Sequence, residues 1–209
     1  MKPSKEALLA VAAQRALPDP AHDYQHVLRV VANAQHLAER EHANVELCVA
    51  AAALHELFNY PKGHPDSKKS GEVCADHAKA WLREQGVDKA FVQAVTYAIA
   101  VHPFSLGIQP TTLEAKILQD ADRLDAIGAI GIARCFATCA EMKRPFYSID
   151  DPMCRKRLPN DKDFGVDHFF SKLVRIPEHL NTATARAMAE PRIGIMRAYL
   201  AQFESEITP

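Results

Sequence analysis

The residues best suited to chemistry begin with His55 and Glu56, which close the most apolar stretch of the chain, VAAAALHELF. Burying a charged pair in such a stretch is costly unless a partner or a metal ion neutralises it. Imidazole nitrogen and carboxylate oxygen together suit a divalent transition metal. The pair is therefore a candidate metal site.

Two other segments offer ligands of the same kind. His22 and His26 are four residues apart in AHDYQHVLRV and share one face of a predicted helix. The otherwise apolar ILQDADRLDAIGAIG contains three carboxylates, Asp120, Asp122 and Asp125. Asp122 and Asp125 can share a helical face, whereas Asp120 points about 200° away from Asp122. A single buried histidine is more often a core residue, and helical carboxylates are more often solvated, but the combination in this order is more specific.

The order of these motifs resembles the HD-domain metal-dependent phosphohydrolase superfamily, in its bacterial branch of small single-domain proteins. The resemblance covers about residues 20–206. The motifs that carry it are His22-Asp23-x-x-His26-x-x-Arg29-Val30, Ala51-Ala52-Ala53-Leu54-His55-Glu56, the nearly unbroken Gln119–Arg134, and His168-Phe169-Phe170-Ser171-Lys172-Leu173.

This resemblance implies a metal centre and its ligands. His26 matches the first metal-binding histidine, His55 matches the histidine of the HD pair, and Glu56 stands where the family has aspartate. Asp122 best matches the distal metal-binding aspartate, with Asp120 as the alternative if the register differs. Glu56 and Asp122 are thus also catalytic candidates. The implied cofactor is a divalent metal ion; these mixed ligands favour Mn²⁺, Fe²⁺, Co²⁺ or Ni²⁺ over Mg²⁺, and the sequence does not choose among them.

Two departures from the family bear on activity. Glu56 is one methylene longer than aspartate, which can displace the metal, and about 1 Å of misplacement can cost ~10²-fold in rate. Asn59 stands where many relatives carry another acid, and an amide is a poor general base. The segment that follows offers Asp66 as a substitute catalytic acid and His64 as a substrate contact through phosphate. Its other interpretation is a solvated loop before the next helix.

Three more side chains are candidate contacts for a phosphorylated substrate. His102 ends the apolar AIAVHPF, and it is either a catalytic contact to phosphate or leaving group, or a helix-end cap. Arg123 and Lys172 match phosphate oxygens, or else they pair with Asp125 or another carboxylate. Asp23 either orients a metal-bound histidine or caps a helix.

A mostly helical chain must position these residues. Glycine is scarce, at 8 of 209 residues, and good helix formers abound, which predicts an all-α fold; the resemblance implies an HD-domain helical bundle. One domain, residues 1–209, is expected, with a core at about 20–140 and C-terminal helices at about 164–206. GAIG at 128–131 is a candidate close helix crossing, and the loop 142–164 is a lid or a linker. The expected helices span about 5–17, 23–41, 45–57, 70–85, 89–101, 112–125, 127–139, 166–174 and 182–206.

Composition and charge narrow the classes of function. The 25 Lys+Arg and 26 Asp+Glu residues give a net charge of −1, so we expect attraction neither to nucleic acid nor to a membrane surface. Five cysteines without a CxxC pair indicate reduced thiols and a cytoplasmic protein. The apolar stretch Leu8–Ala13 is too short for a signal peptide. Apolar helical faces make a homodimer reasonable.

The predicted function is that of a metal-dependent phosphohydrolase acting on a small phosphorylated molecule, a nucleotide in the first place. Relatives imply cleavage of a nucleoside triphosphate to the monophosphate and pyrophosphate, or cleavage of a phosphomonoester. The departures at Glu56 and Asn59 motivate a second hypothesis, a non-catalytic or regulatory HD protein that binds a nucleotide or a partner.

Overall fold

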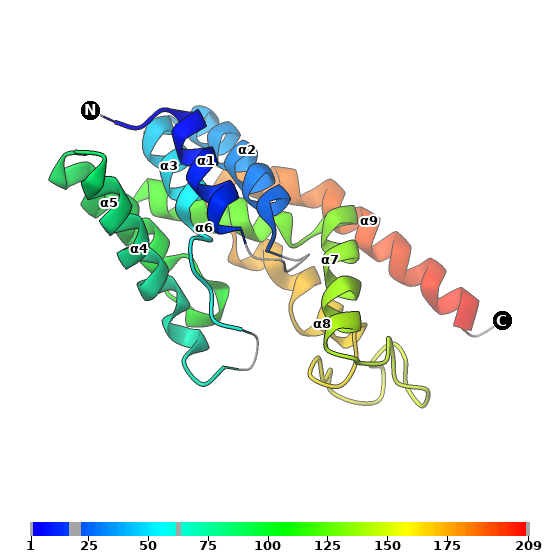
Figure 1. Ribbon diagram of the computed structural model, residues 1–209. Coiled ribbons are helices and arrows are strands. Elements are labelled where there is room, and N and C mark those ends of the chain that lie inside the picture. The colour runs from blue at the N-terminus through cyan, green and yellow to red at the C-terminus, as the bar shows by residue number, and fades with distance from the viewer. Residues whose placement is uncertain (1, 17–21, 62–63, 208–209) are drawn as a thin grey trace. The chain divides into compact units, whose positions relative to one another are not determined.

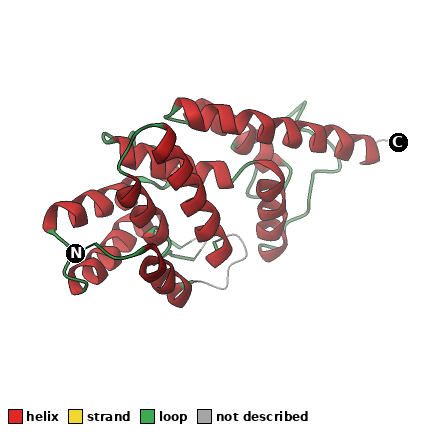
Figure 2. Ribbon diagram, turned by 90° about the horizontal axis from the view of Figure 1, so that it is seen from above, coloured by secondary structure: helices red, strands yellow, loops and turns green. Residues whose placement is uncertain are grey.

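The computed structural model describes residues 2–16, 22–61 and 64–207, and all regular elements within these ranges are helices (Figures 1 and 2). The all-α prediction is therefore confirmed. Contacts divide the chain into two compact units, residues 1–122 and 123–209, which are described separately. The expectation of a single domain stays a prediction. No helix of the described residues is both long and apolar enough to cross a membrane.

The first unit is built around a short, fully apolar helix. All residues from Leu47 to Leu54 are buried, and this helix, α3, packs against α1, α2 and α5, while α4 packs against α5. Its helices are α1 (Lys5–Arg15), α2 (Tyr24–Arg40), α3 (Val45–Leu54), α4 (Ser70–Glu84), α5 (Lys89–Val101) and α6 (Leu113–Asp125), the last three residues of α6 being assigned to the second unit, with short 3₁₀ turns η1 (Ser67–Lys69) and η2 (Phe104–Leu106). Side chains that accept a hydrogen bond from the first turn cap five of these helices, namely Ser4, Asp23, Asn44, Asp88 and Thr112.

Helix α3 ends three residues before the predicted Leu57. Its last residue is Leu54, and His55 is the C-cap residue. The Cys74 thiol on α4 donates to Leu54 O at 3.3 Å and His55 O at 3.1 Å, and so it takes carbonyls that a longer helix would use. The first helix also ends early, at Arg15. Leu17 and Pro18, where it was expected to stop, lie outside the described residues.

The second unit contains α7 (Gly128–Glu141), α8 (Asp167–Ser171), the 3₁₀ segment η3 (Leu173–His179) and α9 (Ala183–Ile207). The predicted helix 166–174 is wrong in part, because the backbone leaves the helical region at Lys172 and continues as η3, with Pro177 inside it. The close helix crossing predicted at 128–131 is confirmed at Gly128, where α7 begins beside α9. The φ of Gly128 is 80°, and an added Cβ would lie 3.1 Å from Cβ of Arg192 on α9.

The loop between α7 and α8 is tied down by a buried carboxylate. Asp167 is fully buried and accepts hydrogen bonds from both terminal nitrogens of Arg157 and, at 2.6 Å, from the main-chain N–H of Asn160. Asp151 accepts from the N–H groups of Arg155, Lys156 and Arg157 at 3.0, 2.7 and 3.1 Å. The sequence predicts either a lid or a linker for this loop. The contacts of Asp167 and Asp151 fix the loop within the second unit.

Asp167→Asn should reduce the free energy of unfolding by about 2–3 kcal/mol, because it removes from a fully buried position the charge that pairs with Arg157. Burial raises the pKa of Asp167, but the hydrogen bonds from Arg157 and Asn160 outweigh it, so the pKa lies below its ordinary value. The extra stability of wild type over Asp167→Asn is therefore fully present at neutral pH. This extra stability is lost as the pH falls from about 3.9, the ordinary aspartate pKa, through the pKa of Asp167 in the folded state.

Urea unfolding at several pH values measures this difference. Asp150→Asn is the matched control, because Asp150 is an exposed acid in the same loop, and it should change stability by less than about 0.5 kcal/mol. Equal stability of Asp167→Asn and wild type at pH 7 would contradict the account of the loop.

Candidate metal centre

Three ligand atoms from α2 and the end of α3 converge inside the first unit. His26 Nε2 lies 3.2 Å from His55 Nε2, and Glu56 Oε1 lies 3.8 and 3.9 Å from these two nitrogens. The three residues form a group whose ligand atoms all lie within 4.8 Å of one another. Both histidines are buried, while the Glu56 side chain is one-tenth exposed.

Asp122 on α6 completes the cluster. Its Oδ1 lies 3.5 Å from His26 Nε2. One contact that brings α6 to this place comes from Asn33, seven residues after His26 on α2, whose side-chain amide donates to Ala121 O at 3.3 Å. Residues seven apart share a helical face, so one face of α2 carries His26 and also holds the residue before Asp122. This proximity favours Asp122 over the fully buried Asp120 as the distal ligand.

The separations fit a single divalent cation. Metal–ligand distances of about 2.1 Å place two ligand atoms about 3.0 Å apart at a right angle, about 3.4 Å apart in a tetrahedron and about 4.2 Å apart when they are opposite. Within the group of His26, His55 and Glu56 the separations are 3.2, 3.8 and 3.9 Å, inside this range, and Asp122 Oδ1 lies 3.5 Å from one member of the group, His26 Nε2. Two neutral imidazoles and two carboxylates would also balance the charge of a divalent ion.

His55 presents a nitrogen lone pair to the cluster. Its Nδ1 lies 2.6 Å from Ala52 O, and a carbonyl only accepts hydrogen bonds, so the ring proton is assigned to Nδ1 and Nε2 is left unprotonated. Burial, and then the neighbouring His26 and His102, hold the pKa of His55 well below its usual value. The ring is therefore neutral at pH 7, which is the form that binds a metal.

His102 lies beside this cluster and also caps a helix, so both interpretations of the sequence have a structural counterpart. Its ring is 5.3 Å from the His55 ring, nearly perpendicular to it, and its Nδ1 lies 2.6 Å from Ile99 O at the end of α5. Gln119 on α6 fixes the surrounding loop, because its amide donates to Val101 O at 3.3 Å and to Ile108 O at 2.9 Å.

The other predicted residues of the first unit make local contacts. Asp66 forms an ion pair of 2.7 Å with Lys69, and the hydrogen bond from this lysine lowers the pKa of Asp66. A carboxylate with a lowered pKa accepts a proton poorly at neutral pH. His64 stacks on Tyr60, with ring centroids 4.6 Å apart. Asp23 accepts from the His26 N–H at 2.8 Å, as an N-cap does.

Arg123 and Lys172 belong to the second unit. Arg123 is buried and donates to His179 O. Asp125, which the sequence offered as a partner of Arg123, pairs with Arg134 at 2.9 Å. Lys172 lies at the junction of α8 and η3. Their contact with substrate phosphate stays a prediction.

Three supporting residues were missed by sequence reasoning: Asn33, Cys74 and Gln119. Each is a small polar side chain that hydrogen-bonds a main-chain carbonyl near a candidate ligand. Cys74 was counted only as a reduced thiol, and all five cysteines are free in the structure. Nothing in its local sequence indicates the distant carbonyl that it contacts. Gln119 is the first residue of the family motif Gln119–Arg134, and its place in this motif is the one feature of the sequence that could have indicated a role near the site.

Known proteins share these motifs. The HD domain family profile matches residues 23–127. The chain is also 33% identical to the protein YpgQ of Bacillus subtilis over 190 residues, which cover 89% of this chain and 84% of YpgQ. The chain belongs to the HD domain family. The resemblance noted from the motifs is thereby confirmed.

Solved structures of HD-family proteins extend the similarity to nearly the whole chain. A crystal structure of B. subtilis YpgQ in complex with ADP is 30% identical, with a TM-score of 0.76 and 98% of both chains covered. An HD-superfamily hydrolase from Bacillus thuringiensis is 29% identical, with a TM-score of 0.72 over 97% of this chain and 98% of that one. The HD family of this chain thus includes proteins named as hydrolases.

His55→Ala should abolish metal retention, because it removes a ligand atom from the centre of the cluster. After loading with Mn²⁺ and desalting, wild type should retain about one ion per chain and the variant none, as measured by elemental analysis. His36→Ala is the matched control, since His36 is exposed on the same helix as His26.

Asp122→Asn and Asp120→Asn test the distal ligand in the same assay. Retention should fall in Asp122→Asn and persist in Asp120→Asn. The reverse result would assign the ligand to Asp120, and retention by His55→Ala equal to that of wild type would remove the metal centre altogether.

Proposed function

We propose that this HD-family chain is a metal-dependent phosphohydrolase that acts on a nucleotide. The observation that carries the proposal is the meeting of His26, His55 and Glu56 at separations that suit one divalent cation, with Asp122 Oδ1 3.5 Å from His26 Nε2. Such an ion, when bound, lowers the pKa of water and neutralises phosphate oxygens, which is the chemistry that phosphate-ester hydrolysis needs.

The relatives support a phosphorylated substrate. B. subtilis YpgQ, 30% identical over 98% of this chain, has been crystallised with ADP. An ADP-binding relative favours a nucleotide over other phosphate esters. We therefore propose two reactions, the cleavage of a nucleoside triphosphate to the monophosphate and pyrophosphate, and the cleavage of a phosphomonoester. In the first, water forms a bond to the α-phosphorus and the bond from this phosphorus to the bridging oxygen breaks.

Different residues of this chain are proposed for proton transfer and for contact with phosphate. Glu56 is the carboxylate of the His26–His55–Glu56 group, and Asp122 is the more exposed carboxylate beside it; these two are the candidates to accept a proton from the attacking water. His102 lies beside His55 with its Nδ1 engaged by Ile99 O, so its Nε2 is the atom proposed to contact phosphate or the leaving group. Asp66 is a weaker candidate, because its pKa is lowered by Lys69.

Three further side chains are proposed to bind the charged end of the substrate. Arg123, Lys172 and His64 carry groups that can donate hydrogen bonds to phosphate oxygens. Arg123 offers the rigid guanidinium geometry that matches phosphate, although one of its terminal nitrogens already donates to His179 O. Their contribution is expected in KM more than in kcat, since they would bind substrate and transition state alike.

A second function is favoured by Glu56 and Asn59, which stand where relatives carry aspartate and a further acid. A longer ligand and a missing base would leave nucleotide binding intact and remove turnover. The chain would then be a binding or regulatory protein. Glu56 Oε1 does reach the cluster, at 3.8 Å from His26 Nε2, and this reach favours the enzyme over the binder.

The deciding experiment is a panel of nucleoside tri-, di- and monophosphates with the Mn²⁺-loaded protein. Separate detection of orthophosphate and pyrophosphate distinguishes the two reactions. We expect turnover by wild type and by the His36→Ala control, and a loss of at least about 10³-fold in His55→Ala. Glu56→Asp tests the departure at this position, and an unchanged or higher rate is expected, because the shorter side chain restores the ligand of the family.

Two outcomes would oppose the proposal. Tight nucleotide binding without turnover in wild type, with turnover appearing in Glu56→Asp, would establish the binding protein. Equal turnover by wild type and His55→Ala after chelation of metal would show that the activity does not belong to this cluster.

A further inference from the structure

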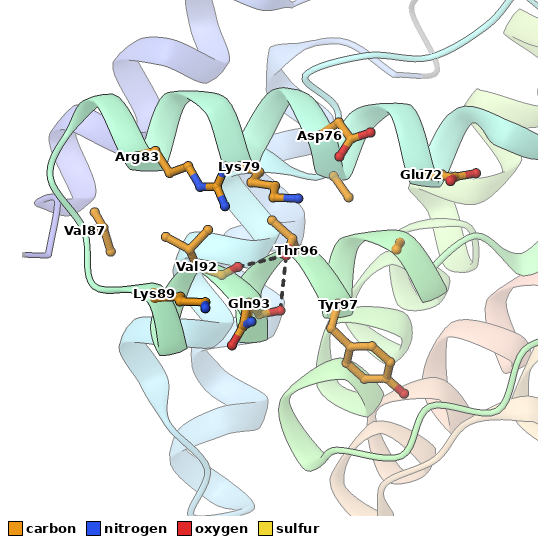
Figure 3. Close-up of a pocket in the computed structure, with 12 residues that line it drawn as sticks. Glu72, Asp76, Lys79, Arg83, Val87, Lys89, Val92, Gln93, Thr96 and Tyr97 are labelled. Atoms are coloured by element: carbon orange, nitrogen blue, oxygen red, sulfur yellow. Dashed lines mark hydrogen bonds between the residues drawn. The ribbon is translucent and has the colours of Figure 1, made fainter.

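A groove lies between α4 and α5 of the first unit (Figure 3). Its volume is about 540 Å³, within the range of roughly 300–1,000 Å³ typical of pockets that bind small molecules. Part of its lining is apolar and includes the buried Ala75, Val87 and Val92. The candidate metal ligands are not among its lining residues, so the groove is a separate feature of the first unit.

Charged side chains line the groove in two groups. The basic group comprises Lys79 and Arg83, one turn apart on α4, and Lys89, the first residue of α5. The acidic group comprises Glu72 and Asp76 on the first two turns of α4. Figure 3 shows the basic side chains toward one end of the groove and the acidic ones toward the other. The groove therefore has a positive end and a negative end.

The cations of the basic group form no ion pair within the described part of the chain. Among the described residues no carboxylate forms an ion pair with Lys79, Arg83 or Lys89. Other cations of the chain do have such partners, as in the pairs Arg134–Asp125 and Arg157–Asp167. Like charges that face one groove repel each other, and an anion bound between them would relieve this repulsion.

The neutral hydroxyl groups of the groove are already engaged. Thr96 Oγ1 donates to carbonyls of its own helix, Val92 O at 2.9 Å and Gln93 O at 3.2 Å, as the dashed lines in Figure 3 mark. Tyr97 OH lies 2.7 Å from Thr111 Oγ1 and accepts from Thr111 N at 3.0 Å, which fixes the ring beside the groove. Recognition of a ligand is left mainly to the charged groups and to apolar contact with the Tyr97 ring.

We propose that this groove binds a small organic phosphate, at a site distinct from the candidate metal centre. The phosphate would lie against Lys79, Arg83 and Lys89, and an apolar or aromatic body would lie along the apolar lining and the Tyr97 ring. Amino or hydroxyl groups at the far end of the ligand would donate to Glu72 or Asp76. A nucleoside diphosphate has all three parts, so ADP is a suitable probe.

Calorimetric titration measures this binding directly. We expect ADP to bind saturably to protein freed of metal with a chelator, with Kd between about 10 μM and 1 mM. Lys79→Ala/Arg83→Ala should weaken this binding at least about tenfold, because it removes two cations while keeping good helix formers. Lys156→Ala/Lys162→Ala, at exposed positions of the second unit, changes net charge equally and should bind like wild type.

The His55→Ala variant separates this proposal from the proposed function. It should retain groove binding, at one ADP per chain by calorimetry, whatever becomes of hydrolysis. No saturable heat of binding at about 5 mM ADP would overturn the proposal, as would equal affinity in Lys79→Ala/Arg83→Ala. Adenosine binding as tightly as ADP would remove the role of phosphate, and pyrophosphate binding as tightly as ADP would remove the role of the organic body.

Discussion

Two imidazole nitrogens that face each other inside an apolar unit constrain the structure around them. His26 Nε2 and His55 Nε2 are 3.2 Å apart, and both rings are buried. His55 Nε2 keeps its lone pair because Nδ1 is engaged by Ala52 O. An N–H on His26 or a cation can then bridge the two nitrogens favourably. To bind a metal together with His55, His26 must present the lone pair of Nε2, which a neutral imidazole does when its proton is on Nδ1.

The helices around this pair are fixed by polar contacts as well as by apolar packing. Asn33 connects α2 to α6, Gln119 connects α6 to the loop around His102, and Cys74 connects α4 to the end of α3. Each contact satisfies a main-chain carbonyl in a region with little water, where an unpaired carbonyl would be costly. Apolar residues alone bring helices together with some freedom of register, whereas these contacts specify one register. The position of the candidate ligands depends on that choice.

The sequence predicted the candidate ligands better than it predicted their supports. His26, His55 and Glu56 could be selected because their types and order match a family motif, and α5 was placed correctly because Asp88 and Pro103 bound it. The end of α3 could not be predicted, since the apolar pattern continues through Leu57 and the Cys74 thiol that takes its carbonyls is twenty residues from Leu54. The contacts that fix the loop between α7 and α8 could not be predicted for a similar reason. In the sequence Arg157 and Asp167 look like solvated charges, and only the structure shows that they form an ion pair.

The end of α3 at Leu54 has a consequence for the electrostatics of the site. Peptide dipoles aligned along a helix leave a partial negative charge, equivalent to roughly half an elementary charge, at the carboxyl end. His55 is the C-cap of α3, so the candidate centre lies at this negative end and the backbone itself favours a cation there. A continuing helix would also turn adjacent side chains about 100° apart. His55, at φ −72° and ψ −14°, is still in the right-handed helical region, and the long Glu56 side chain places Oε1 3.9 Å from His55 Nε2. The pairing of histidine and acid in consecutive positions thus falls at the negative end of a helix, where the backbone favours a cation.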